Sequence, residues 1–245
     1  MTTFLPPDLS ALDVFAFVWL LVLWSAYNLV MGRLGTRVPT INEQMRVMRH
    51  QWMERFLDRD TRIMDSQVLG HTIHSVTFFA STSMLVVAGL IGVFGAVDTA
   101  YGVVNELSFA VRTSKEFFEM KLLVVVGVFA FGFFKFTWAL RQYNYTCAMM
   151  GGAPLYPVDE DLRHELADTM ADAITSAISA FNGGLRSYYF ALAVLTWFIH
   201  PWLFIGATAW VVALLLYRQL GSKFFHAAKR HGILMETRAS ERDRS

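Results

Sequence analysis

Residues 182–217 read Asn182-Gly183-Gly184-Leu185-Arg186, then an apolar run to Ile199, then His200-Pro201-Trp202 and a second apolar run to Tyr217. As one helix, this stretch crosses a bilayer once. As two helices joined by a bend at Pro201, it crosses twice. Proline favours the bend because it disfavours helix in the preceding residue and lacks a backbone N–H donor. The choice decides on which side of the membrane the other loops lie.

The composition indicates a membrane protein. Of the 245 residues, 55% are hydrophobic, whereas a soluble domain is about 45–50% apolar. The apolar residues come in blocks of about 20, the length that crosses a bilayer as a helix. The net charge of +1 gives no reason to expect a nucleic-acid partner. The single cysteine, Cys147, excludes an intrachain disulfide and a C-x-x-C site.

We expect an all-α fold: a polytopic membrane helix bundle with about five transmembrane crossings and long cytoplasmic amphipathic extensions. One transmembrane domain covers residues 1–225, with crossings at about 12–31, 75–97, 121–140, 180–199 and 202–217. A basic, partly disordered cytoplasmic tail follows at 226–245. The alternative has four crossings, with residues 185–217 as one kinked helix.

The distribution of lysine and arginine favours five crossings. The connection 32–73 is rich in arginine and the tail is basic, and such segments stay on the cytoplasmic side. Five crossings place both there, together with the connection 141–181, whereas four place the tail outside. We therefore predict a multi-pass protein of the bacterial inner membrane with its N-terminus outside and its C-terminus in the cytoplasm.

Both long connections contain an amphipathic helix. The first begins at Thr40, which forms a capping box with Glu43, and the second begins at Asp159 and is acidic. Opposite charges predict that the two helices pack together, with apolar contacts contributing most, since an exposed ion pair adds only about 0–1 kcal/mol. The first helix also carries a basic face, which we interpret as lying on anionic headgroups or, alternatively, as a functional site. Its residues are Arg46, Arg49, Trp52 and Arg55.

The candidate ligand or path residues lie in two predicted crossings. Two adjacent glycines inside a helix cost about 1 kcal/mol each relative to alanine, which beside Arg186 indicates close backbone approach, a bend or an opened site. The alternative is a helix break at the interface with Arg186 as its anchor. Lys135 either extends toward the headgroups or faces the bundle interior. The full candidate set is Asn182, Gly183, Gly184, Arg186, Lys135 and Arg141.

Histidines provide the only candidates for a metal or haem site. His71 and His74 lie one helical turn apart near a membrane face, but we located no third ligand. The sequence also has no glycine-rich phosphate loop, no G-x-S-x-G and no H-E-x-x-H motif. We therefore predict no metal, no cofactor and no catalytic residue.

A strip of small residues marks the second apolar block. Gly89, Gly92 and Gly95 recur every three positions, and small residues allow two membrane helices to approach closely. The strip predicts a neighbouring helix on that side.

The sequence resembles the membrane family called domain of unknown function 599 over nearly its whole length. The most specific parts are the Gly-Leu-Arg-Ser-Tyr segment and the arginine-rich first loop. The resemblance implies an integral inner-membrane protein of this size and brings no activity with it. The residues that carry the resemblance are Asn42, Arg46, Trp52, Asp65, Ser81, Ser83, Lys121, Lys135, Arg141, the run from Phe181 to Tyr189, and Trp197.

Three classes of function fit these features. The first is an oligomeric channel or transporter with charged residues lining a polar path. The second is an accessory or scaffold subunit of a membrane complex that docks through its cytoplasmic helices. The third is a haem- or metal-binding membrane protein that uses His71 and His74. The expected partners are the lipid bilayer and either further copies of the chain or other membrane subunits.

Overall fold

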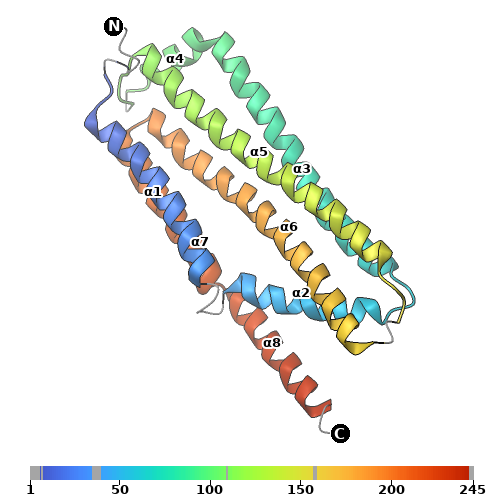
Figure 1. Cartoon of the computed structure of the whole chain (residues 1–245). Helices are drawn as coiled ribbons and strands as arrows, with labels where there is room; N and C mark the ends of the chain where they lie inside the picture. Colours follow the sequence, from blue (N-terminus) through green and yellow to red (C-terminus); the bar gives the residue numbers. More distant parts are fainter. Residues whose placement is uncertain (1–5, 7, 35–39, 109, 157–158, 243–245) are drawn as a thin grey trace. The chain divides into compact units, whose positions relative to one another are not determined.

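All secondary structure in the described part of the chain is helical, which confirms the predicted all-α class (Figure 1). The computed structural model describes residues 6, 8–34, 40–108, 110–156 and 159–242. The α-helices are α1 (Ala11–Leu34), α2 (Ile41–Leu57), α3 (Ile63–Gly95), α4 (Val97–Glu106), α5 (Lys115–Gly152), α6 (Glu160–Leu195), α7 (Pro201–Leu220) and α8 (Lys223–Arg242).

Four helical stretches of the described chain are long and apolar enough to cross a membrane. They are Ala11–Met31 in α1, Ile63–Gly95 in α3, Lys115–Gly152 in α5, and Pro201–Leu234 in α7 and α8. These stretches are what a multi-pass membrane protein requires. Helix α6 falls outside this group because its first half is acidic and its second half contains Asn182, two glycines and Arg186. A fifth crossing by α6 therefore stays a prediction, as does the sidedness of the termini.

The chain reverses at the predicted bend. Helix α6 ends at Leu195, a single 3-10 turn covers Thr196–Phe198, and α7 begins at Pro201. Proline suits the first helical position because the N–H that it lacks has no partner inside the helix there. Figure 1 shows α7 returning in the opposite direction to α6. The bend is confirmed, and the alternative of one kinked helix over residues 185–217 is wrong.

Contacts between residues divide the chain into two compact units. The first unit comprises residues 1–28, 77–137 and 181–213. At its centre, Trp197 stacks on Phe204 with ring centroids 5.0 Å apart, and its indole N–H donates to the Asp13 carboxylate at 2.8 Å. The Trp197 carbonyl accepts from the buried Lys121 ammonium at 3.1 Å. The turn after α6 is thereby tied to the starts of α1 and α5.

The second unit comprises residues 29–76, 138–180 and 214–245. Helix α2 starts at Thr40, whose hydroxyl accepts from the Glu43 N–H at 3.3 Å, so the capping-box position is confirmed on the Thr40 side. The corner between α2 and α3 is held by the buried Asp65 carboxylate, which accepts from the Trp52 indole at 2.6 Å and from Arg59 at 2.5 Å. A carboxylate buried this fully requires such charge-assisted hydrogen bonds.

Helix α8 covers most of the predicted basic tail. It continues to Arg242 and contacts α2. Gly232 of α8 is buried, and a Cβ there would lie 3.0 Å from the Gln44 side-chain oxygen. Residues 243–245 of the predicted tail lie outside the described residues.

The glycine strip on α3 differs from expectation. A Cβ added at Gly89, Gly92 or Gly95 would meet nothing within 4 Å in the described chain. The close approach occurs instead between α5 and α6. A Cβ at Gly184 would overlap the Phe136 ring, at 2.7 Å from its Cδ1 atom, and a Cβ at Gly132 would overlap the Ser187 hydroxyl.

Replacing Gly184 by alanine is therefore expected to destabilise the protein. Overpacking of this kind costs about 1–3 kcal/mol, which outweighs the gain in helix propensity of about 1 kcal/mol. Gly92→Ala is the matched control, since its added methyl group meets open space. Thermal unfolding in detergent should show a lower midpoint for G184A and an unchanged or higher one for G92A. Equal midpoints would contradict this account of α5–α6 packing.

The predicted sidedness can be tested with the native cysteine. Cys147 is exposed near the end of α5, in the connection that five crossings place in the cytoplasm. We expect a membrane-impermeant maleimide to label Cys147 in inside-out vesicles and to leave it unlabelled in spheroplasts, with Cys147→Ser as the blank. Labelling in spheroplasts would reverse the proposed orientation.

Candidate functional site

The two glycines of the 182–186 segment lie inside α6, in the first unit. Both are buried, and neither has a positive φ angle, so their role is to leave space and not to permit a special backbone conformation. The position that a Cβ would take on Gly183 is 3.5 Å from Cδ of Lys135 and 3.6 Å from Nη2 of Arg186. Two cationic side chains, one from α5 and one from α6, therefore lie over the same glycine.

These two cations have aromatic neighbours. The Arg186 guanidinium carbon lies 5.7 Å from the centre of the Tyr27 ring, and the Lys135 ammonium lies 5.5 Å from that of Phe131. The buried Nε of Arg186 has no hydrogen-bond acceptor. Throughout the described chain, no carboxylate lies within ion-pair distance of Arg186 or Lys135. The site therefore has an excess of positive charge.

The hydroxyl groups around this site are already paired. Ser187 is buried and donates to the Gly184 carbonyl at 2.7 Å. Ser83 on α3 donates to the Phe79 carbonyl at 2.8 Å and lies 3.0 Å from the Tyr188 hydroxyl. These hydroxyl groups are satisfied by one another and by the helix backbone.

The structure separates the other residues of this candidate set. Asn182 is half-buried in α6, and Gly184 packs under Phe136 and away from any open space. Arg141 is exposed on the part of α5 that belongs to the second unit. The residues that the structure brings together are Lys135, Gly183 and Arg186.

The predicted basic face of α2 divides into two pairs. Arg46 and Arg55 are exposed, so a headgroup role stays a prediction for them. Arg49 is buried and donates from Nε to the Thr175 hydroxyl of α6 at 2.9 Å. Burial lowers the pKa of Arg49 from its ordinary value, against the opposing effect of Tyr143 and Glu43. Trp52 bonds to Asp65, so Arg49 and Trp52 hold the second unit together.

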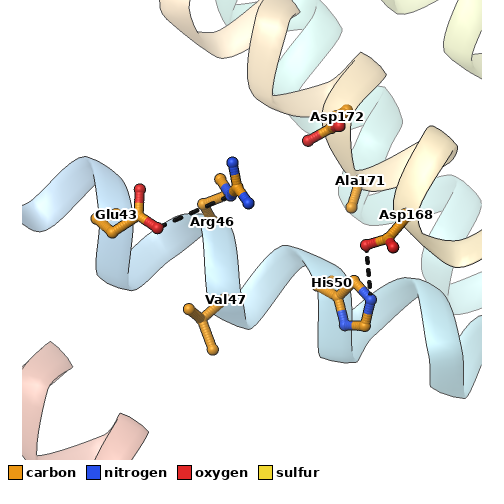
Figure 2. Close-up of a pocket in the computed structure, with 7 residues that line it drawn as sticks. All are labelled: Glu43, Arg46, Val47, His50, Asp168, Ala171 and Asp172. Atoms are coloured by element: carbon orange, nitrogen blue, oxygen red, sulfur yellow. Dashed lines mark ion pairs between the residues drawn. The ribbon is translucent and has the colours of Figure 1, made fainter. Parts of the chain in front are cut away.

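A pocket between α2 and α6 has a mixed-charge lining (Figure 2). Its groups pair with one another: Glu43 lies 3.9 Å from Arg46, and His50 lies 2.9 Å from Asp168. With a neutral His50, the lining holds three carboxylates and one guanidinium, so it carries an excess of negative charge. The lining residues are Glu43, Arg46, Val47, His50, Asp168, Ala171 and Asp172.

The histidines singled out in the sequence lie on the surface. His71 and His74 are exposed on α3. Within the described ranges, the group of three side chains able to share a metal ion is a different one, His50, Glu54 and His164.

The burial of Lys121 is not indicated by the sequence, in which this lysine is one of the residues that carry the family resemblance. Lys121 is 2% exposed and shares a pocket with Asp13, which is 5% exposed. Lys121 also lies 4.3 Å from the centre of the Phe117 ring. In the sequence it stands at the start of an apolar block, where a flanking lysine is ordinary. No local signal links it to an aspartate in the first helix.

A family model that matches most of the chain shows to which family the protein belongs. Residues 15–224 match the family model described as Protein of unknown function, DUF599. The chain belongs to this family. The matched residues of this DUF599 protein include Lys135, Gly183 and Arg186. The match confirms the resemblance seen in the sequence. No curated protein and no solved structure matches the chain.

The division of the basic face predicts unequal effects on stability. Arg49→Ala removes the donor to Thr175 and leaves a buried void, whereas Arg46→Ala removes a side chain that is 56% exposed. Hydrogen bonds from charged groups contribute about 1.5–3 kcal/mol, and exposed substitutions stay within about 0.5 kcal/mol. Thermal unfolding of both variants should show a clear fall in the unfolding midpoint for R49A alone. A similar fall for R46A would contradict the assignment of Arg49 as buried and Arg46 as exposed.

Proposed function

We propose that this DUF599 protein is a membrane channel or transporter whose polar path carries a small anion past Gly183. The observation that supports this is the meeting of Lys135 and Arg186 over one glycine with no carboxylate at ion-pair distance among the described residues. In membrane proteins, basic side chains inside the helix bundle mark ligand or ion pathways.

Electrostatics explains why such a site favours an anion. Two like charges close together in a low-dielectric interior destabilise each other, and removing each from water has its own cost. An anion or a chain of waters between them relieves both effects. Gly183 contributes by keeping the space between the two side chains free of a Cβ.

The placement of the lysines on α5 adds support. Lys121 and Lys135 lie about four turns apart, a spacing that returns to the same side of a helix. Lys121 borders a pocket that Asp8, Ser10 and Arg112 also line. Both lysines therefore lie on one side of α5, with the buried apolar residues Val125 and Val128 between them.

Reactivity of a cysteine at position 183 provides the test. In a Cys147→Ser background, Gly183→Cys places the Cβ that carries the thiol at ordinary van der Waals distance from Lys135 and Arg186. We expect an anionic methanethiosulfonate reagent to modify this thiol faster than a cationic one of similar size, because the two cations attract the anion. Mass measurement of the protein in proteoliposomes reports the modification.

Two controls make the result specific. Gly127→Cys lies at an exposed position of α5 with nothing within 4 Å, and we expect it to stay unmodified in lipid. Adding Lys135→Gln should reduce the preference for the anionic reagent, whereas adding Arg141→Gln should leave it unchanged. A position-183 thiol that reacts with neither reagent, or faster with the cationic one, would overturn the proposal.

An accessory role in a membrane complex is the second candidate. The exposed strip of Gly89, Gly92 and Gly95 favours it, because small residues let a helix of a second copy or another subunit approach closely. This candidate predicts an unreactive thiol at position 183 and copurification with a second membrane chain.

A further inference from the structure

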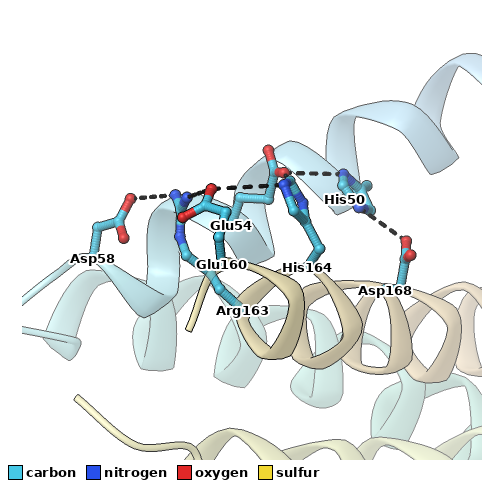
Figure 3. A network of polar contacts seen from close by, with 7 residues as sticks. All are labelled: His50, Glu54, Asp58, Glu160, Arg163, His164 and Asp168. Atoms are coloured by element: carbon cyan, nitrogen blue, oxygen red, sulfur yellow. Dashed lines mark hydrogen bonds and ion pairs between the residues drawn. The ribbon is translucent and has the colours of Figure 1, made fainter. Parts of the chain in front are cut away.

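Two histidines and a glutamate converge where α2 meets α6 in the second unit (Figure 3). His50 and Glu54 are one turn apart on α2, so both project from the same side of that helix, and His164 comes from α6. Their potential ligand atoms all lie within 4.8 Å of one another. Two imidazoles and one carboxylate are a ligand set that zinc uses in proteins.

The distances within this group fit a shared ion. In a tetrahedral site with bonds of about 2.0–2.1 Å, neighbouring donor atoms are about 3.3 Å apart. Nδ1 of His164 lies 3.1 Å from Oε1 of Glu54, and Nδ1 of His50 lies 3.9 Å from the same oxygen. The widest separation among the three ligand atoms is within 4.8 Å, so binding an ion requires the His50 ring to move toward Glu54.

The outer nitrogens of both rings face further carboxylates. Nε2 of His50 lies 2.9 Å from Asp168, and Nε2 of His164 lies 3.6 Å from Glu160. Histidines that bind metals usually donate their second N–H to such a carboxylate, which fixes the tautomer and orients the ring. With an ion bound, a proton on each Nε2 would face these outer carboxylates, and the two Nδ1 lone pairs would be free to bind the ion.

The charge balance of the cluster also favours a cation. The carboxylates of Glu54, Asp58, Glu160 and Asp168 and the guanidinium of Arg163 lie around the two histidines (Figure 3). Arg163 bridges Asp58 at 2.7 Å and Glu160 at 2.8 Å, so its charge is already engaged. With neutral imidazoles the cluster carries an excess of negative charge, which a divalent ion offsets.

We propose that His50, Glu54 and His164 bind one divalent transition-metal ion of the zinc class, with Asp168 and Glu160 as positioning residues. Nitrogen and oxygen donors in this combination suit Zn²⁺ and its neighbours and not Ca²⁺ or Mg²⁺, which prefer oxygen alone. The bound ion joins α2 to α6 and stabilises the second unit. The site does not depend on the proposed anion path.

Metal titration of the purified full-length chain tests this proposal. After the protein in detergent is stripped with a chelator, we expect Co²⁺ to bind at one ion per chain with the visible absorption of a low-coordinate site, and Zn²⁺ to displace it. Zn²⁺ should raise the unfolding temperature. We expect His164→Ala to lower the affinity for Co²⁺ at least tenfold. Asp168→Asn should lower it by about 10–100-fold, which is the usual effect of losing a carboxylate that orients a metal-binding histidine.

His74→Ala is the matched control, because it removes an exposed histidine from α3 and should leave binding unchanged. Glu54→Gln keeps the side chain's size and guards against loss of fold, which a circular dichroism spectrum checks; it too should weaken binding at least tenfold. The proposal is overturned if wild-type protein binds no stoichiometric ion, if H164A and E54Q bind like wild type, or if H74A removes binding.

Discussion

The missing Cβ atoms of Gly183 and Gly184 set the arrangement of the first unit. At Gly184 the space is filled by the Phe136 ring, so α5 and α6 approach closely, and at Gly183 it admits the stems of Lys135 and Arg186. Close approach through small residues is a main way in which membrane helices associate, because lipid gives little hydrophobic gain. The close approach of α5 and α6 and the meeting of Lys135 with Arg186 therefore have the same cause.

The second unit depends on apolar burial and on polar contacts between α2 and α6. Apolar side chains of α2 and α6 are buried, and the polar contacts between these helices involve both signs of charge. His50 faces Asp168 and His164 faces Glu54, while Arg163 of the acidic helix pairs with Asp58. The packing of α2 and α6 expected from their opposite charges is confirmed, although the exposed arginines of α2 do not supply these pairs. Weak exposed ion pairs do not select one pairing over another.

The two proposals rest on separate compact units and on opposite charge balances. Around Gly183 there are cations with no carboxylate within ion-pair distance in the described chain, whereas around Glu54 there is an excess of carboxylates. Each imbalance is unfavourable in isolation and is relieved by a ligand of opposite charge. The DUF599 match covers both groups of residues.

The sequence by itself determined the long apolar helices, the start of α2 and the break between α6 and α7, because block length, capping at Thr40 and the backbone limits of Pro201 act locally. It also pointed to residues 182–186, since glycines beside an arginine are unusual in an apolar helix. Tertiary structure alone decided that Lys135 meets Arg186, that Arg49 is buried while Arg46 is exposed, and that His50 joins His164 instead of His71 joining His74. These facts depend on how helices distant in the chain pack, and no spacing along the sequence encodes which side chains then face each other.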